Sequence, residues 1–599
     1  MGSQDSLSSI DMAAEMDQSL LPDRLEQLAA QEPDRIWVSY AVSQDIAKDG
    51  FRNITLAQYS RAVDRMAWHI ESTIGKSSTF ETFLYFGLTD VRYAIILLSA
   101  IKTGRKVLFC SHFNSTYFNQ SVCDKTECGI LLHSEGVEST IDPLLQARPM
   151  KAIQVPTLES LVDPEGDVER YPYSKEFSVG IDEPMFVTHT SGTTGLPKPV
   201  TMTQRSLVIA SAWDKVPDLD GKPPVEKLMR NGRRCFMGFP LFQFSGVANG
   251  LWEVFYRGKT LVLPCNQPGW APPATFEQLF EHGDFDCFIG IPYYLELMAK
   301  SLKMMDIVKD RLKYIMYGGA TLNPSTGDKL AALCPFFSCI GSTESGVAFT
   351  HLIDRQDWAW FCFNEDQSGI VWEKQDIQGI EDGAGGVYEL TYVKNPLVAK
   401  SQPIFWHTDR GDTIKTDDLF IKHPTKEHLW RYYARKDDMV VTKYGWNINP
   451  VIVEYEIARH PSVKAVVVGG AGREAIFAIV ELIESDESPE ETLDKVWAAV
   501  EDETNAKLDK IAQLNKERVI LADRKNKPLP LTPKGNVVRG PALKLYEEEI
   551  EEMYKRTADP TVGWATSKRK RKGDDVVFLS PRKVSRIDPA VTVAEISAL

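Results

Sequence analysis

A run of hydroxyl and glycine residues in front of a lysine is the part of the chain best suited to bind phosphate. The run consists of Thr190, Ser191, Gly192, Thr193, Thr194, Gly195, Leu196, Pro197, Lys198 and Pro199. Hydroxyls and glycine amides in a tight turn donate several hydrogen bonds to phosphate oxygens, and a lysine adds positive charge. The Walker spacing G-x-x-x-x-G-K-[ST] does not occur in this run. The run therefore favours a nucleoside triphosphate site of another kind, with a flexible surface loop as the alternative.

Four further short motifs follow in chain order and supply glycine, carboxylate and arginine residues. They are Gly318-Gly319-Ala320, Ile340-Gly341-Ser342-Thr343-Glu344, Thr416-Asp417-Asp418-Leu419-Phe420 and Tyr433-Ala434-Arg435-Lys436-Asp437. With the run at 190–199 they resemble, in order, the signature motifs of the adenylate-forming superfamily. This superfamily comprises acyl-CoA synthetases, the adenylation domains of nonribosomal peptide synthetases, and firefly luciferases. The resemblance covers about residues 20 to 555, and its details are most similar to stand-alone or synthetase-like adenylation domains of fungal secondary metabolism.

The resemblance implies ATP-dependent activation of a carboxylic acid, with Mg²⁺ as the metal ion. It places the phosphates against residues 190–195 and Lys198, and the metal ion against Glu344 and Thr194. Asp418 would accept hydrogen bonds from both ribose hydroxyls, and Arg435 would bridge ribose or phosphate. Asp437 would be the hinge at which a small C-terminal domain reorients. The other nucleotide-binding residues that it implies are Gly319, Ala320, Ile340, Gly341, Ser342 and Thr343, and the catalytic residues are Lys198, Glu344 and Lys534.

Two of these assignments have rivals or gaps within the sequence. Asp412 follows a glycine and competes with Asp418 for the ribose; Asp418 is preferred because Leu419 and Phe420 follow it in the family's register. Lys534 lies in the segment LTPKGNV at 531–537, which resembles the family's loop with a catalytic lysine. Most family members place that lysine directly after the glycine, where this chain has Asn536. Lys534 can therefore serve only if the loop is shifted.

Three other departures from the family's pattern bear on activity. Ile340 stands where an adenine-stacking aromatic residue is usual, Ala434 where a glycine precedes the arginine, and Asn447 where a basic residue is often found. They keep a second hypothesis open, in which the chain is a catalytically decayed relative that binds nucleotide without turnover.

The segment 239–246, with sequence FPLFQFSG, resembles the entrance of the family's acid pocket. Amino-acid-activating relatives place an aspartate at the position of Gln243 to pair with the substrate ammonium group. A buried ammonium group without a partner costs about 3 to 5 kcal/mol, so an α-amino acid is disfavoured. An aromatic, α-keto or medium-chain acid is the prediction, with Trp252 as a residue of the core. The substrate-pocket residues predicted are His189, Phe242, Gln243, Phe244 and Gly318.

The acceptor of the acyl group is predicted to be a separate molecule. Carrier proteins bear a G-G-x-S loop for their phosphopantetheine arm, and residues 561–599 contain none. Coenzyme A is the preferred acceptor, and the carrier domain of another protein is the alternative.

The elements that position these motifs belong to an α/β fold. Short apolar runs such as 81–88, 106–111, 129–134 and 185–189 alternate with amphipathic stretches such as 91–102, a pattern typical of stacked βα units. The predicted domains are an AMP-binding N-terminal domain at 1–434, a small α+β lid at 435–560, and a basic tail at 561–599, which is expected to be disordered.

The composition excludes several other classes of protein. The net charge of −15 opposes binding to nucleic acid. The longest apolar runs are shorter than the roughly 20 residues that a membrane span needs. Nine cysteines without a CxxC pair fit neither a disulfide framework nor a zinc site. We expect a cytoplasmic protein; the basic run at 568–572 and the C-terminal Ser597-Ala598-Leu599 are weak signals for a nuclear or peroxisomal one.

Overall fold

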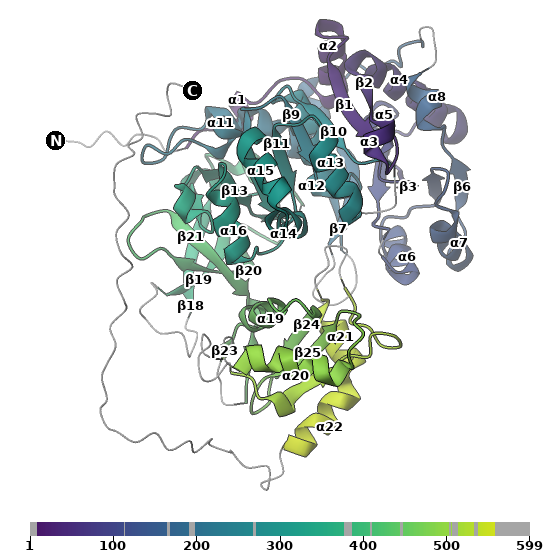
Figure 1. Ribbon diagram of the computed structural model, residues 1–599. Helices are drawn as coiled ribbons and strands as arrows, with labels where there is room; N and C mark the ends of the chain where they lie inside the picture. The colour runs from purple at the N-terminus through teal and green to yellow at the C-terminus, as the bar shows by residue number, and fades with distance from the viewer. Residues whose placement is uncertain are drawn as a thin grey trace, which may run out of the picture. The chain divides into compact units, whose positions relative to one another are not determined.

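The structure is a computed structural model and describes residues 9–112, 114–163, 168–190, 198–266, 271–375, 386–407, 410–443, 447–501, 505, 513–531 and 537–557. Figure 1 shows the chain as a ribbon with helices and strands labelled. Within these ranges, no helix is long and apolar enough to cross a membrane.

The first sheet has seven strands, of which only the edge strand β2 is antiparallel to its neighbour. Its central strands are apolar on both faces, as in Phe288 and Ile289 of β11, because helices cover both sides of a parallel sheet. In spatial order the strands are β13 (Phe336–Cys339), β12 (Tyr314–Gly318), β11 (Cys287–Gly290), β9 (Arg234–Met237), β10 (Thr260–Leu263), β1 (Ile36–Ala41) and β2 (Phe51–Thr55).

The second sheet repeats this arrangement with six strands and one antiparallel edge, β8. The apolar runs predicted at 81–88, 106–111, 129–134 and 185–189 all contribute strands to it. In spatial order the strands are β6 (Lys151–Gln154), β5 (Ile130–His133), β3 (Thr82–Phe86), β4 (Lys106–Phe109), β7 (Pro184–Thr190) and β8 (Lys198–Thr203).

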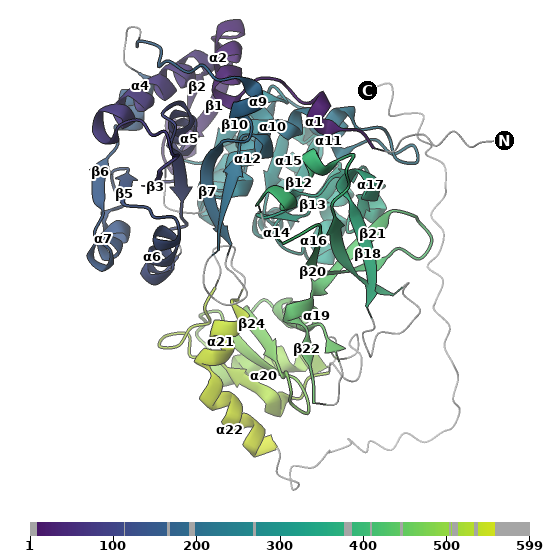
Figure 2. The same ribbon diagram turned by 180° about the vertical axis from the view of Figure 1, so that it is seen from behind.

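Helices α5 and α12 lie between the two sheets (Figure 1 and Figure 2). Helix α5 contacts β4 and β7, helix α12 contacts β9 and β10, and the two helices contact each other. The helices around the second sheet are α2 (Leu21–Gln31), α4 (Leu56–Ile74), α5 (Arg92–Lys102), α6 (Thr116–Lys125), α7 (Glu138–Ala147) and α8 (Leu158–Val162). Those around the first sheet are α12 (Phe244–Phe255), α13 (Pro273–His282), α14 (Pro292–Lys300), α15 (Leu302–Arg311) and α16 (Pro324–Ala331).

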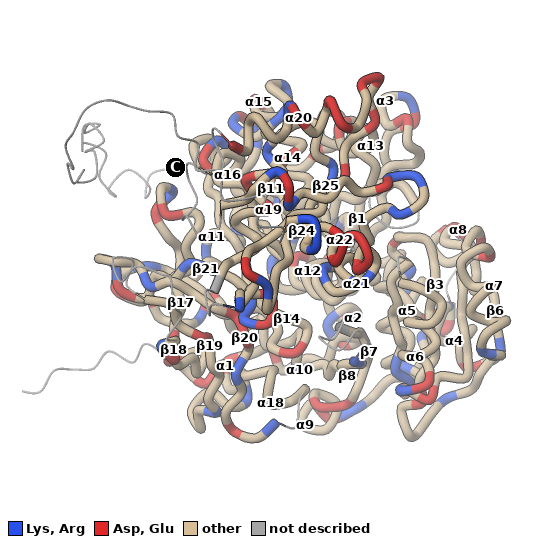
Figure 3. The backbone as a smooth tube through the Cα atoms, turned by 90° about the horizontal axis from the view of Figure 1, so that it is seen from below, with Lys and Arg blue, Asp and Glu red and all other residues tan. Residues whose placement is uncertain are grey.

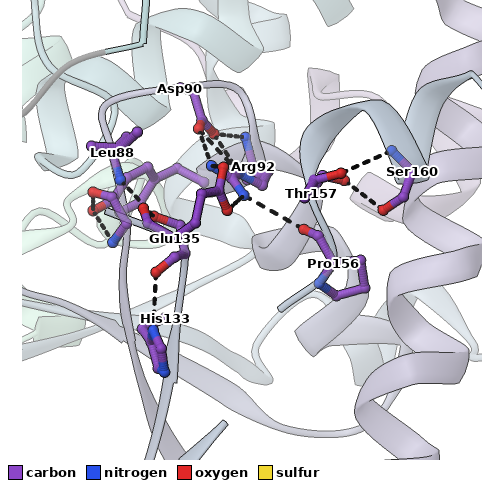
Figure 4. Close-up of polar contacts among 11 residues, drawn as sticks. Leu88, Asp90, Arg92, His133, Glu135, Pro156, Thr157 and Ser160 are labelled. Carbon is purple, nitrogen blue, oxygen red and sulfur yellow. Dashed lines mark hydrogen bonds and ion pairs between the residues drawn. The ribbon is translucent and has the colours of Figure 1, made fainter. Parts of the chain in front are cut away.

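A buried arginine ties together the loops that follow three strands of the second sheet (Figure 4). The guanidinium group of Arg92 donates to both carboxylate oxygens of Asp90, at 2.7 to 3.2 Å, and to both oxygens of Glu135, at 2.7 and 3.0 Å. It also donates to the carbonyl oxygen of Pro156 at 3.5 Å. The side chains of Arg92 and Asp90 are 0% and 1% exposed. Burial raises the pKa of Asp90 despite the nearby Arg92.

A third, antiparallel sheet follows the two parallel ones in the chain. More and less exposed residues alternate over the first six positions of its strand β20, before the buried residues Leu419, Phe420 and Ile421. In spatial order its strands are β16 (Thr350–His351), β17 (Phe361–Phe363), β21 (Leu429–Arg435), β20 (Thr413–Lys422), β19 (Val387–Val393) and β18 (Ile370–Gln375). The short helices α17 (Glu365–Ser368) and α18 (Ile404–His407) occur in the same region of the chain.

The C-terminal α+β part has its own apolar core, built on residues such as Val453, Val468 and Val480. A capping box of Ser488 and Glu491 begins α20. The elements are β22 (Val440–Val441), β23 (Asn447–Ile448), α19 (Pro450–Ala458), β24 (Val463–Gly469), β25 (Phe477–Leu482), α20 (Pro489–Ala499), β26 (Val519–Leu521) and α21 (Arg539–Leu545).

The last described helix, α22 (Glu547–Thr557), falls in a compact unit that begins at Glu548. Its first turns are acidic, as Figure 3 shows in red, and its last turn contains Lys555 and Arg556. Negative charge at the start of a helix and positive charge at its end both favour the helix dipole. The tail predicted to be disordered lies outside the described residues.

Candidate active site

Strands β7 and β8 hold the two ends of the run at 190–199. They are antiparallel, and Thr190 lies opposite Lys198 in their register. Lys198 is exposed at the first position of β8. Ser191, Gly192, Thr193, Thr194 and Gly195 lie outside the described residues, as does the side chain of Thr190. The phosphate contacts proposed for them stay predictions.

His189 lies on β7 directly before this run. Its Nε2 atom lies 3.0 Å from Nδ2 of Asn114, and the ring of Phe118 meets it edge-on with centroids 5.0 Å apart. Since an amide nitrogen only donates, the proton of His189 is on Nδ1 in this arrangement. Burial lowers the pKa of His189 to about 4. The imidazole is therefore neutral at pH 7.

The glycine turn at 318–320 follows β12 and lies next to the motif at 340–344. Gly318 pairs with Cys339, the last residue of β13. Gly319 has a φ of 87°, a left-handed conformation that glycine adopts without strain. Both segments leave the carboxyl ends of neighbouring parallel strands, the edge at which α/β sheets bind ligands.

The motif at 340–344 is a tight turn with no room for side chains at its base. Gly341 and Ser342 form β14 (Gly341–Ser342), which pairs with β15 (Gly346–Val347). A Cβ atom on Gly341 would lie 2.1 Å from the carbonyl oxygen of Gly346. The amides of Ser342 and Ser345 each donate to the hydroxyl of the other residue, at 3.1 and 3.0 Å. Ile340 packs against the aromatic cluster of the third sheet, and Thr343 is half-buried.

This turn presents Glu344 with its backbone fixed and its carboxylate available. The carbonyl oxygen of Glu344 accepts a hydrogen bond from Nδ1 of His407 at 3.0 Å. In the part of the chain that the structure describes, its half-buried carboxylate makes no hydrogen bond or ion pair. An oxygen ligand without protein partners suits Mg²⁺, which binds proteins through one or two carboxylates. Glu344 therefore fits the metal ion predicted for it.

Asp418 and Arg435 lie opposite each other on β20 and β21. One carboxylate oxygen of Asp418 lies 3.7 Å from Nη1 of Arg435, and Nε of Arg435 lies 2.9 Å from Asp437. Asp417 has a φ of 62°, and the hydroxyl of Thr416 accepts from the amide of Asp418 at 3.2 Å. Burial raises the pKa of Asp418 to about 6, against the charge of Arg435; the negative charges of Asp437, Asp417 and Glu344 also raise it. Glu344 is therefore near enough for its charge to act on Asp418, although less strongly than Asp437 and Asp417.

The rival carboxylate, Asp412, has a different environment. Its side chain is 80% exposed and lies 3.3 Å from Nζ of Lys394. Lys534 and Asn536 lie outside the described residues, although Leu531 and Val537 form a bridge on either side of them. The side chain of Asn447 is also outside the described part.

The residues predicted to form or border the substrate pocket differ in their surroundings. Phe242 and Trp252 are each 2% exposed, and Nε1 of Trp252 donates to the carbonyl oxygen of Leu207 at 2.9 Å. Gln243 precedes the first residue of α12 without capping it, and Phe244 stacks on Phe186 with centroids 6.3 Å apart.

A mostly apolar cavity of about 40 Å³ is lined in part by residues that precede and follow the motif at 340–344 in the chain. Its wall includes Trp252 but none of the five residues predicted for the substrate pocket. The wall of the cavity also contains an ion pair, in which Arg257 donates two hydrogen bonds of 2.8 and 2.6 Å to Glu226. The lining residues are Trp213, Val225, Glu226, Met229, Asn249, Trp252, Arg257, Met316, Phe337, Ser338, Cys339, Val347, Ala348, Phe349 and Thr350.

Two family models match the chain over most of its length. Residues 25–368 match the model described as AMP-binding enzyme, and residues 437–558 match the AMP-binding enzyme C-terminal domain.

Similar curated proteins are considerably longer than this chain. A carboxylic acid reductase of Neurospora crassa is 29% identical over 546 residues, which are 89% of this chain and 50% of that protein. An isocyanide synthase and nonribosomal peptide synthetase hybrid of Aspergillus fumigatus is 28% identical over 551 residues, 91% of this chain and 34% of that protein. An adenylate-forming reductase of Serpula lacrymans is 26% identical over 553 residues, 86% of this chain and 48% of that protein. The chain thus spans a third to a half of these relatives.

Solved structures show the same fold at low identity. The acetoacetyl-CoA synthetase of Streptomyces lividans superposes with a TM-score of 0.66 at 17% identity, over 90% of this chain and 86% of that one. A benzoate CoA ligase of Burkholderia xenovorans gives 0.62 at 19%, over 87% and 99%. The O-succinylbenzoate coenzyme A synthetase of Bacillus subtilis in complex with ATP and magnesium ion gives 0.60 at 18%, over 87% and 98%.

Proposed function

The chain belongs to the AMP-binding enzyme family and has its α/β fold of a large N-terminal and a small C-terminal domain; from this we propose that it uses ATP to convert a carboxylic acid into an acyl-adenylate and pyrophosphate. The observation that carries the proposal is the pair of Asp418 and Arg435, whose charged groups lie 3.7 Å apart, with Glu344 near enough for its charge to act on Asp418. We place the domain boundaries near residues 434 and 560.

The reaction brings two anions together, so neutralising charge is the main task of the site. An oxygen of the acid attacks the α-phosphorus of ATP, and the bond from that phosphorus to pyrophosphate breaks. Lys198 and residues 190–195 would hold the departing phosphates, and Lys534 would neutralise the attacking carboxylate. Glu344 and Thr194 would hold the magnesium ion, which would offset part of the triphosphate charge. Arg435 faces Asp418, and both would contact the ribose.

We propose an aromatic, α-keto or medium-chain acid as the substrate class. An α-ammonium group would find no carboxylate at Gln243, the position at which amino-acid-activating relatives place an aspartate. The solved structures with this fold include ligases for acetoacetate, benzoate and O-succinylbenzoate, none of which is an α-amino acid.

The acyl-adenylate then needs an acceptor. We propose a thiol, with coenzyme A preferred because the similar structures include CoA ligases. The alternative is the carrier domain of a separate protein, which the length of the curated reductases and of the peptide synthetase hybrid supports. Incubation with ATP, acid and each acceptor, followed by mass spectrometry of the thioester, separates the two.

Acid-dependent exchange of radiolabelled pyrophosphate into ATP tests the activity. A panel of aryl, keto, fatty and amino acids should give exchange with at least one acid of the first three classes and none with the amino acids. Nucleotide binding without exchange for any acid would instead favour the decayed relative. The variant Lys534→Ala should lose exchange if that lysine reaches the substrate; activity equal to wild type would remove it from the catalytic residues.

The pKa of Asp418 predicts how the KM for ATP changes with pH. A pKa of about 6 means that Asp418 is ionised at pH 7.5 and mostly protonated at pH 5. A protonated carboxyl group is a weaker acceptor for the ribose hydroxyls. We expect the KM for ATP to rise about fivefold to tenfold between pH 7.5 and pH 5, measured by pyrophosphate exchange at saturating acid.

The isosteric variant Asp418→Asn should have a raised KM for ATP at every pH and lose this dependence on Asp418. It should also discriminate less than wild type between ATP and 2′-deoxy-ATP. A KM for Asp418→Asn that is as low as that of wild type would contradict the assignment of Asp418 to the ribose and would favour Asp412 instead.

A further inference from the structure

One histidine joins the carboxylate motif to the strand that follows the phosphate-binding run. His407 is the last residue of α18, and its Nδ1 atom lies 3.0 Å from the carbonyl oxygen of Glu344. Its Nε2 atom lies 3.0 Å from Oγ of Ser206. Ser206 is 5% exposed and lies on α10 (Arg205–Val208), three residues after the end of β8. Both ring nitrogens are therefore engaged.

The donors and acceptors of this bridge follow from its partners. A carbonyl oxygen only accepts, so Nδ1 carries the proton and donates to Glu344. Nε2 of the neutral ring then accepts from the hydroxyl of Ser206. Burial lowers the pKa of His407, which keeps the ring neutral at pH 7 and agrees with this tautomer.

The helix that bears His407 is itself fixed on both sides. Helix α18 contacts β8, whose first residue is Lys198. On its other side, Pro403 lies so close to the turn that a Cβ atom on Gly346 would come within 3.3 Å of its ring. Nε1 of Trp406 donates to the carbonyl oxygen of Ala399 at 3.2 Å. His407 is thus held between β8 and the turn of residues 341–346.

The hydrogen bond to Glu344 acts on the peptide and not on the carboxylate. It fixes the backbone at the residue whose side chain makes no bond of its own within the described part of the chain. Leaving a buried carbonyl group without a donor costs about 1 to 3 kcal/mol, so removing Nδ1 would make the turn shift to recover a partner. A shift of about 1 Å at a reacting group can cost about a hundredfold in rate.

We propose that His407 is a positioning residue that holds the carboxylate of Glu344 where it binds the magnesium ion of the ATP complex. The inference rests on the proposed function. It adds a residue that no motif of the sequence contains and that links β8 to the turn bearing Glu344.

Two amide variants separate the bond to Glu344 from the bond to Ser206. In His407→Asn the amide nitrogen replaces Nδ1 and keeps the donor to Glu344, whereas in His407→Gln it replaces Nε2 and loses that donor. The readout is the dissociation constant of Mn²⁺ in the presence of a saturating, non-hydrolysable ATP analogue, measured by electron paramagnetic resonance. We expect His407→Gln to weaken Mn²⁺ binding about tenfold, the lower end of effects for residues that orient a metal ligand. We expect His407→Asn to stay within twofold of wild type.

Two controls make the result specific. Binding of the analogue in EDTA should be unchanged in both variants, because the metal-free nucleotide does not depend on Glu344. His282→Gln, a change at the exposed end of α13, should match wild type in every assay.

Equal Mn²⁺ affinity in wild type and His407→Gln would overturn the inference, as would equal losses in both amide variants or a matching loss of metal-free binding. Failure of the proposed function gives a different result. Wild type would then bind Mn²⁺ and the analogue but show no acid-dependent pyrophosphate exchange.

Discussion

Replacing Arg92 by methionine should lower the free energy of unfolding by about 3 to 5 kcal/mol at pH 7, the usual cost of removing one partner from a buried ion pair. The guanidinium group is fully buried and donates to Asp90, Glu135 and Pro156, while the side chain of Asp90 is only 1% exposed (Figure 4). Methionine fills a similar volume, so the loss reflects the charge left on Asp90 more than a cavity. Urea denaturation and hydrogen exchange of peptides from β3 and β5 measure it.

Protonation of Asp90 limits this cost and makes it depend on pH. Without Arg92, the buried carboxyl group can become neutral at a cost of 1.36 kcal/mol for each pH unit above its unfolded pKa of about 3.9. That cost is about 4 kcal/mol at pH 7 and about 1.5 kcal/mol at pH 5. The folded variant binds a proton that the unfolded chain releases, so its deficit relative to wild type should shrink as the pH falls from 7 to 5.

The double variant Asp90→Asn, Arg92→Met provides the matched control. It removes the buried charge, so it should be more stable at pH 7 than Arg92→Met alone and should lack the pH-dependent deficit. A deficit that is the same at pH 5 and pH 7 would show that lost packing or lost hydrogen bonds, not the charge on Asp90, sets the stability of this cluster.

Much of the fold could be predicted because its parallel strands carry a strong pattern. Strands such as β3 and β11 are buried on both faces, so their sequences are continuous apolar runs between turns. The antiparallel third sheet was not predicted. The first six residues of its strand β20 alternate in exposure and include Thr416, Asp417 and Asp418, which look like a loop motif in the sequence. The direction of the edge strands β2 and β8 depends on pairing and has no local signal.

The site shows the same division between motif residues and residues contributed by tertiary contacts. Motif order singled out Glu344, Asp418 and Arg435; the structure pairs Asp418 with Arg435, and the charge of Glu344 acts on Asp418. His407 and Ser206 belong to no motif. His407 bonds both Ser206 and the carbonyl oxygen of Glu344, and this depends on the packing of α18 against β8. The cavity beside the motif is likewise lined by segments from 213 to 350, apart from the five residues predicted for the substrate pocket. Sequence motifs do not reveal such contacts between segments that are far apart in the chain.

Glu344→Gln should have the largest effect on catalysis, with a loss of about a hundredfold to a thousandfold in the rate of pyrophosphate exchange. The expected magnitude is that of removing one group that stabilises transition-state charge, about 2.7 to 4 kcal/mol. Glutamine keeps the shape and the hydrogen-bonding oxygen but loses the negative charge that attracts Mg²⁺. Because the carboxylate has no hydrogen bond or ion pair within the described residues, the substitution breaks no contact between these residues, and the thermal midpoint should not change.

Two matched carboxylates make this prediction specific to Glu344. Asp412→Asn removes an exposed charge whose ion-pair partner among the described residues is Lys394, so its exchange rate should equal that of wild type. Asp418→Asn should raise the KM for ATP more than it lowers the rate at saturating ATP, because its partner is the ribose and not the reacting phosphate. Glu344→Gln should instead lose rate at saturating ATP and need more Mg²⁺ for half-maximal activity. Exchange within threefold of wild type at saturating ATP and millimolar Mg²⁺ would remove Glu344 from the metal site, and with it the reason for His407 to hold the peptide of Glu344.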